Sequence, residues 1–176
     1  MIDRDADIEL ETAGAMAQFD EHRDVAPYRV HLDHPGLLRM ASHYGIAPAN
    51  LHALAEKMED WTFNQGGVDA DGLYYVTNCN PDGYFDWYEI GGRWNGWLNG
   101  KNVIKAATLA ADETLKKRLP FFILTPDGDW IKREYHYLVG NLLKTETMSD
   151  AAWLKQVRGL LERWPDHQVV CVDAHC

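Results

Sequence analysis

Residues 78–97 read NCNPDGYFDWYEIGGRWNGW, and this stretch decides how the middle of the chain is predicted to fold. The NPDG sequence at residues 80–83 is typical of a tight turn, because Pro presets φ and Gly adopts positive φ without strain. Residues 73–77 and 84–90 flank it and alternate as strands do, so a β-hairpin is predicted. Gly91-Gly92 ends the second strand and permits a close approach by backbone or ligand.

The predicted second strand places aromatic and acidic side chains on both of its faces. Successive side chains of a strand point in opposite directions, so Asp86 shares a face with Tyr84 and Tyr88. The phenol hydroxyls of that face are placed to hydrogen-bond the Asp86 carboxylate. Trp87 and Glu89 lie on the opposite face.

Arg93 is the one cation between residues 61 and 100, against five acids. A guanidinium can stack on an aromatic ring such as that of Trp94 while its planar fork binds a carboxylate or phosphate. One interpretation is an internal ion pair with Asp86 or Glu89 that holds the hairpin together. The other is a pocket floor that binds an anionic group, and the residues alone leave both open.

The sequence NPDGYFDWYEIGGRWNGWL resembles a signature, N-P-x-x-x-W-D-W-Y-x-[IV]-G-G-R-W-x-G, of a family of small uncharacterised bacteriophage and bacterial proteins. A weaker resemblance runs through PFFILTPDGDW and the later tryptophan-containing helix to the closing VDAHC, which is similar to a V-D-x-H ending. It covers about residues 70–175. Tyr84-Phe85 and Ala174 depart from the pattern, and the acidic start lacks the apolar first strand of that family.

The resemblance implies which positions form a site, but it implies no established activity. The matching positions are Asn80, Asp86, Trp87, Tyr88, Gly91, Gly92, Arg93, Trp94 and His175.

Three side chains are candidates for acid–base chemistry. Asp173 and His175 are two residues apart, so on a strand they share a face and form a base with its orienting carboxylate, half a metal site, or a solvated pair. Asp86 is the third candidate. The histidines of residues 31–34 lack any strong metal-ligand spacing, and no phosphate-binding glycine loop occurs. We therefore expect neither a metal nor a cofactor.

The flanking segments predict helices and further strands. Residues 8–21 predict a helix with Leu10, Ala13, Met16 and Ala17 on its inner face, and residues 28–32 a short strand. Helices that start at Pro35 and Ala47 predict a helical hairpin, with Leu37, Leu38, Met40, Ala41 and Tyr44 on the apolar side of the first. Residues 64–71 are predicted as loop.

The C-terminal half predicts a second hairpin and one more helix. Residues 121–125 and 129–137 flank the turn Pro126-Asp127-Gly128. Ser149 is placed to cap a helix, and residues 168–173 predict a final strand. The apolar positions of that helix are Trp153, Val157, Leu160, Leu161 and Trp164.

These elements predict an α+β fold, with an antiparallel or mixed sheet and helices packed on it. The 176 residues suit a single domain. Its segments are an acidic helix or arm at residues 1–26, the helical hairpin at 27–61 and an α+β core at 70–176.

Charge and composition restrict the function. The net charge is −10 and residues 1–26 contribute −6, which argues against general nucleic-acid or anionic-membrane binding. The start of the sequence lacks the pattern of a signal peptide, and we expect a cytoplasmic protein with its three cysteines as free thiols. The basic run at residues 116–118 is predicted as a solvated helix end.

Two functions follow from these observations. The first is a phage- or mobile-element-type accessory protein that binds a host protein through an acidic surface, for example to inhibit a host defence. The second is a small enzyme on a phosphate-bearing or nucleotide-like ligand, in which Arg93 holds the anion, Trp94 stacks on the ring, and Asp86 or His175 transfers protons.

Overall fold

The computed structural model describes residues 4–23, 28–31, 34–47, 50, 67–68, 74–77, 80–139 and 142–175. The chain forms two compact units that interleave along the sequence. Unit 1 comprises Met1–Met16, Trp87–Tyr135 and Glu146–His175, and unit 2 comprises Ala17–Asp86, His136–Thr145 and Cys176. Their boundaries differ from those of the segments expected from sequence.

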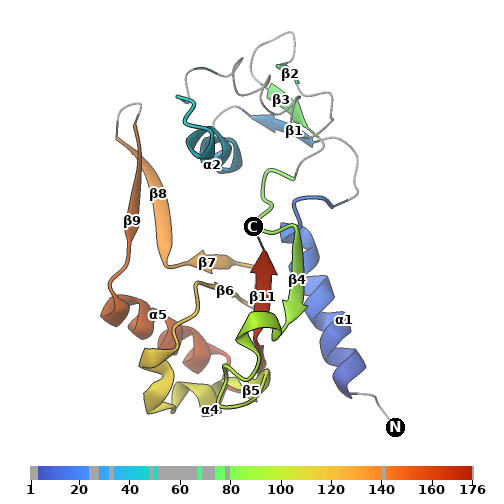
Figure 1. Cartoon of the computed structure of the whole chain (residues 1–176), viewed down its shortest axis with the longest axis vertical. Coiled ribbons are helices and arrows are strands. Elements are labelled where there is room, and N and C mark those ends of the chain that lie inside the picture. Colours follow the sequence, from blue (N-terminus) through green and yellow to red (C-terminus); the bar gives the residue numbers. More distant parts are fainter. Residues whose placement is uncertain are drawn as a thin grey trace. The chain divides into compact units, whose positions relative to one another are not determined.

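Helices and short antiparallel sheets make up both units, which confirms the α+β class (Figure 1). Unit 1 holds α1 (Arg4–Met16), β4 (Trp87–Ile90), η2 (Gly92–Trp94), β5 (Val103–Lys105), α4 (Ala106–Ala110), η3 (Glu113–Lys117), β6 (Phe122–Leu124), β7 (Trp130–Lys132), α5 (Asp150–Arg163), β10 (Gln168–Val170) and β11 (Val172–His175). Unit 2 holds η1 (Ala17–Phe19), β1 (Tyr28–His31), α2 (Pro35–His43), β2 (Gly67–Val68) and β3 (Tyr74–Thr77). Strands β8 (Glu134–Val139) and β9 (Leu142–Thr147) pair with each other and have residues in both units.

The hairpin predicted around residues 80–83 is wrong. Strand β3 pairs with β1 and β2, whereas β4 pairs with β11 at the end of the chain. The backbone after the NPDG turn bonds to an earlier segment, because Tyr84 N–H donates to the Phe19 carbonyl and the Phe85 carbonyl accepts from Glu21 N–H. Phe85 is buried there and precedes the strand, so the predicted alternation holds only from Trp87 onward.

Helix α1 is confirmed, but its predicted inner face is wrong in part. Met16 is buried as expected, whereas Leu10 is 75% exposed, and Ala13 and Ala17 are exposed too. The buried positions are Thr12 and Met16, one helical turn apart. The helix therefore packs along a narrow line of side chains, and Leu10 lies off that line.

The core of unit 1 forms around α5, whose apolar spacing the sequence predicted. Trp153, Val157 and Leu161 are buried, while Leu160 and Trp164 are half-buried. Helix α4 and the turn η3 pack on α5 and supply Leu109 and Leu115 to the same cluster. Ser149 caps the helix, since its Oγ accepts a hydrogen bond from Ala152 N–H at 3.3 Å.

The second predicted hairpin is confirmed in part, with β6 and β7 paired antiparallel across the turn. The predicted strand at residues 129–137 ends at Lys132, and Glu134 begins β8, which pairs with β9. The predicted final strand is divided instead at Cys171. Strand β10 pairs with β5, and β11 lies beside β4 and pairs with it (Figure 1). Residues 168–175 therefore pair with two different strands, and both pairs lie within unit 1.

In unit 2 the predicted strand at residues 28–32 and the helix from Pro35 are confirmed as β1 and α2, with Ala41 buried. The predicted loop contains the two-residue strand β2, paired with β3. The second helix of the predicted helical hairpin lies outside the described residues.

We predict that Trp153→Ala lowers the free energy of unfolding by about 3–5 kcal/mol, because it leaves a cavity in the unit 1 core. The substitution also removes the hydrogen bond from the indole Nε1 to the Pro120 carbonyl, at 2.7 Å. Urea denaturation followed by far-UV circular dichroism measures the change. Leu10→Ala is the control, because a highly exposed side chain contributes within about 0.5 kcal/mol. Equal losses in both variants would contradict this description of the core.

Candidate functional site

The site begins where β4 ends in a glycine corner. Gly91 and Gly92 have φ of 79° and 48°, in the left-handed region that favours glycine. A Cβ on Gly92 would lie 2.5 Å from the Cβ of Asp173, so only glycine permits this approach. The corner leads into η2 and places Arg93 directly over β11.

Arg93 and Asp173 form a bidentate ion pair. The guanidinium Nε lies 2.8 and 3.1 Å from the two carboxylate oxygens of Asp173, and Nη2 lies 2.7 Å from Oδ1. The backbone N–H of Arg93 donates a further hydrogen bond to Asp173 Oδ2 at 2.9 Å. The partner that the structure places here is Asp173, whereas the sequence analysis named Asp86 and Glu89.

Burial differs sharply between the two partners. Asp173 is 2% exposed, while the Arg93 side chain is 67% exposed. Hydrogen bonds from the Arg93 side chain, and then from its backbone N–H, lower the Asp173 pKa to about 2. Asp173 is thus ionised at neutral pH and anchors Arg93, and it is not a general acid there.

The β4–β11 ladder has two different faces. Trp87 pairs with His175 and Glu89 pairs with Asp173, so these four residues share one face, which we call the outer face. The rings of Trp87 and His175 stack at a centroid distance of 5.7 Å and an angle of 12°. Trp87 is half exposed, and both His175 and Glu89 are exposed.

Helix α1 lies on the other face of this ladder, where the tyrosine of β4 points. The pKa of Tyr88 is raised by burial and by the negative charge of Glu9, a residue of α1. The sequence predicts Tyr88 and Asp86 in one site. Tyr88 lies opposite the outer face, and Asp86 is exposed and precedes β4.

Asn80 has a structural role in unit 2. Its buried side-chain amide Nδ2 donates to the Gln18 and Asp20 carbonyls at 2.9 and 3.0 Å. Its Oδ1 accepts from Asp82 N–H at 3.0 Å. These bonds tie the NPDG turn to the segment after α1.

Trp94 follows the glycine corner, and its side chain hydrogen-bonds Asp173. Its ring contacts Trp97 edge to face at 4.7 Å and Phe121 at 6.0 Å. The Sγ of Cys171 lies 3.7 Å from the Trp94 carbonyl, and burial, followed by the charge of Asp173, raises the pKa of this thiol. Cys171 is a free cysteine, whereas Cys79 and Cys176 lie outside the described residues.

The described ranges contain no group of three or more His, Cys, Asp or Glu side chains that could hold a metal ion. His34, a weak ligand candidate from the sequence, accepts from Gly36 N–H through Nδ1 at 3.0 Å, at the start of α2. Its Nε2 lies 3.3 Å from Asp82 Oδ1. Within the same ranges, no helix is both long and apolar enough to span a membrane.

Sequence reasoning missed Asn102 and the role of Asp173. The side-chain oxygen of Asn102 accepts a hydrogen bond from Gly96 N–H. A Cβ added to Gly91 would lie only 2.5 Å from the side-chain nitrogen of Asn102. No spacing marks it in the sequence. The position of Asp173 could have indicated its partner. A carboxylate beside an apolar strand is buried and needs a cation, and Arg93 is the one cation between residues 61 and 100.

No family model, curated protein or solved structure matches the chain.

We predict that the Arg93–Asp173 pair gives the protein an acid-sensitive component of stability. An unfolded aspartate titrates near pH ~3.9. The native carboxylate has a pKa of about 2, so on acidification the unfolded state binds the proton first. The contribution is therefore complete above pH ~4 and is lost as the pH falls from ~4 towards 2.

Thermal melts of the wild type and Asp173→Asn across this range test the prediction. The melting temperature of Asp173→Asn should be several degrees lower near neutral pH, and the gap should close in acid. Asp127→Asn removes an exposed carboxylate paired with Arg163 and should leave the melting temperature unchanged. A gap that is independent of pH would refute the assigned role of Asp173.

We predict that Gly92→Ala destabilises unit 1 by more than about 1 kcal/mol, because alanine combines strain at positive φ with a clash against Asp173. Gly159→Ala is the matched control, since it lies in α5 with nothing within 4 Å of the added Cβ. That change should stabilise by about 0.5–1 kcal/mol. Denaturant midpoints of both variants give the comparison, and an unchanged midpoint in Gly92→Ala would contradict the close approach.

Proposed function

We propose that the protein acts by binding another protein, as an accessory protein of phage or mobile-element type whose partner is a host protein. The observation that carries the proposal is the outer face of the β4–β11 ladder, where Trp87 stacks on His175 beside Glu89 and the exposed Arg93. Trp and Arg dominate the binding energy of protein interfaces. A half-exposed tryptophan on an open sheet face is therefore a natural anchor for a partner.

The outer face is also held in place before any partner arrives. Asp173 is bonded to the side chain and the backbone of Arg93, and the His175 ring supports Trp87. Side chains ordered in advance lose less conformational entropy on binding. The ordered side chains therefore favour binding of a partner without rearrangement of the outer face.

Charge favours a basic partner. Asp5, Asp7, Glu9 and Glu11 of α1 are exposed, and the whole chain carries a net charge of −10. A negative protein attracts a positive one over about a Debye length and raises the rate of association. In this proposal the negative charge of the whole protein attracts the partner, and the outer face anchors it. Inhibition of a host defence protein is one function that suits this arrangement.

The alternative proposal, an enzyme on a phosphate-bearing ligand, has less support. Asp173 is committed to Arg93 with a pKa of about 2, which leaves it unsuited to proton transfer near neutral pH. Tyr88 points away from the outer face that bears Trp87 and His175. The exposed guanidinium of Arg93 is the one feature that favours an anionic ligand.

The experiment is affinity capture from a bacterial lysate, followed by calorimetric titration of the captured protein in purified form. We predict that Trp87→Ala weakens binding by about 30-fold or more, the loss typical of a hot-spot residue. Raising the salt concentration should slow association, because it screens the negative charge of the protein.

Lys155→Ala, an exposed change on α5 away from the outer face, is the control and should bind like the wild type. Circular dichroism of each variant establishes that it is folded. A partner that binds Trp87→Ala and the wild type equally well would exclude the outer face as its binding surface.

A further inference from the structure

Unit 1 contains a cavity of about 730 Å³ that belongs neither to the outer face nor to the acid–base candidates. Small-molecule sites in proteins typically measure about 300–1,000 Å³ and are mostly apolar. Its wall includes Ala15 of α1, the Trp94–Trp97 pair, Arg118 after η3, and Phe121 before β6.

The cavity opens to solvent, so either water or a ligand occupies it. An apolar ligand gains more there than water does, because apolar walls offer water few hydrogen bonds.

The aromatic part of the wall favours a flat ring. Trp94 meets Trp97 edge to face at 78°, and Phe121 lies 6.0 Å from Trp94. Phe121 is nevertheless 72% exposed. An exposed phenylalanine beside two tryptophans presents ring surface to whatever enters, and offset or edge contacts between rings are favourable.

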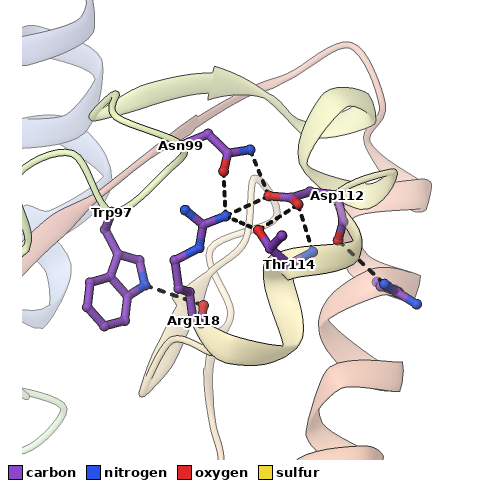
Figure 2. Close-up of polar contacts among 6 residues, drawn as sticks. Trp97, Asn99, Asp112, Thr114 and Arg118 are labelled. Carbon is purple, nitrogen blue, oxygen red and sulfur yellow. Dashed lines mark hydrogen bonds and ion pairs between the residues drawn. The ribbon is translucent and has the colours of Figure 1, made fainter.

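Arg118 is the arginine of the cavity wall, which also includes the acids Glu11 and Asp166, and hydrogen bonds hold its side chain in place (Figure 2). Its Nη2 donates to Asp112, Asn99 and Thr114, and its carbonyl accepts from the Trp97 indole Nε1 at 3.3 Å. Across the residues that the structure describes, Nε and Nη1 of Arg118 have no hydrogen-bond partner. A guanidinium fixed on one side and unused on the other is prepared to bind an anion.

A second cation, Arg158, lies beside the Asp112 that Arg118 binds. The charge of Arg118 is matched by Asp112, at 2.7 Å, but Arg158 also donates to the Asp112 carbonyl and forms no ion pair with any described residue. The Nε of Arg158 is buried and unpartnered among those residues. Of the cavity's two acids, Asp166 is bonded to Lys105, whereas Glu11 of α1 forms no ion pair with any residue that the structure describes.

We propose that this cavity binds an amphipathic small molecule with a flat apolar ring system and one anionic head, a carboxylate or sulfonate. The head binds Arg118, and the rings contact Trp97, Trp94 and Phe121. The site is independent of the protein-binding face, so either proposal can fail without the other.

Three fluorescent probes with one ring system test the head-group preference: 1-pyrenebutyrate, 1-pyrenebutanol and 1-pyrenebutylammonium. Each is titrated with the full-length protein, and pyrene emission reports its transfer to an apolar site. We expect micromolar binding of the butyrate, at least tenfold tighter than that of the alcohol, with the ammonium compound weakest. Arg118→Gln should bring the butyrate to the affinity of the alcohol and leave the alcohol unchanged.

A pair of variants on α1 tests the place of binding. Ala15→Trp fills the cavity from its wall and should abolish binding of all three probes. Ala13→Trp adds the same side chain at an exposed position of the same helix, outside the cavity, and should bind like the wild type. This comparison holds even if Arg118→Gln fails to fold.

Four results would overturn the proposal. Equal affinity for the three probes would exclude a role for the head group, and preference for the ammonium compound would assign the site to Glu11 instead. Undiminished binding by folded Ala15→Trp would place the probes elsewhere. Absence of binding by the wild type at high micromolar concentration would exclude the site altogether.

Discussion

The ion pair between Arg93 and Asp173 is the interaction on which the described part of unit 1 depends. A carboxylate that is 2% exposed requires a cation with good geometry, and Arg93 supplies two side-chain nitrogens and its own backbone N–H. The two residues are 80 positions apart in the sequence. Their pairing therefore holds β11, the end of the chain, beside β4 in the middle of it.

The same constraint explains the glycine corner. Gly92 must bring its backbone against Asp173 so that Arg93 can reach both carboxylate oxygens, and a side chain at position 92 would prevent it. Gly91, Gly92 and Arg93 thus join two strands that are far apart in the sequence. Its aromatic residues then divide between two tasks, with Trp87 on the outer face and Trp94 in the wall of the cavity.

The β4–β11 ladder consequently connects the two proposed sites. Its outer face carries Trp87, His175 and Glu89, while Val172 of β11 belongs to the cavity wall. One short pair of strands, joined by one ion pair, contributes to the proposed protein-binding face and to the proposed ligand cavity. The bond from the Asp173 carboxylate to Arg93 stabilises both strands.

Local chemistry in the sequence was enough to predict the α+β class, α1, α2, the β6–β7 hairpin and the Ser149-capped helix α5. Each depends on neighbours within a few residues: an apolar repeat, a turn sequence or a cap. The unusual character of Arg93 was also visible, because no other cation lies between residues 61 and 100. Only the tertiary structure decided that β4 pairs with β11, that Asp173 is the partner of Arg93, and that Leu10 is exposed while Thr12 is buried. These outcomes depend on contacts between residues far apart in the chain, where burial and charge compensation select one pairing among several that the local pattern permits equally.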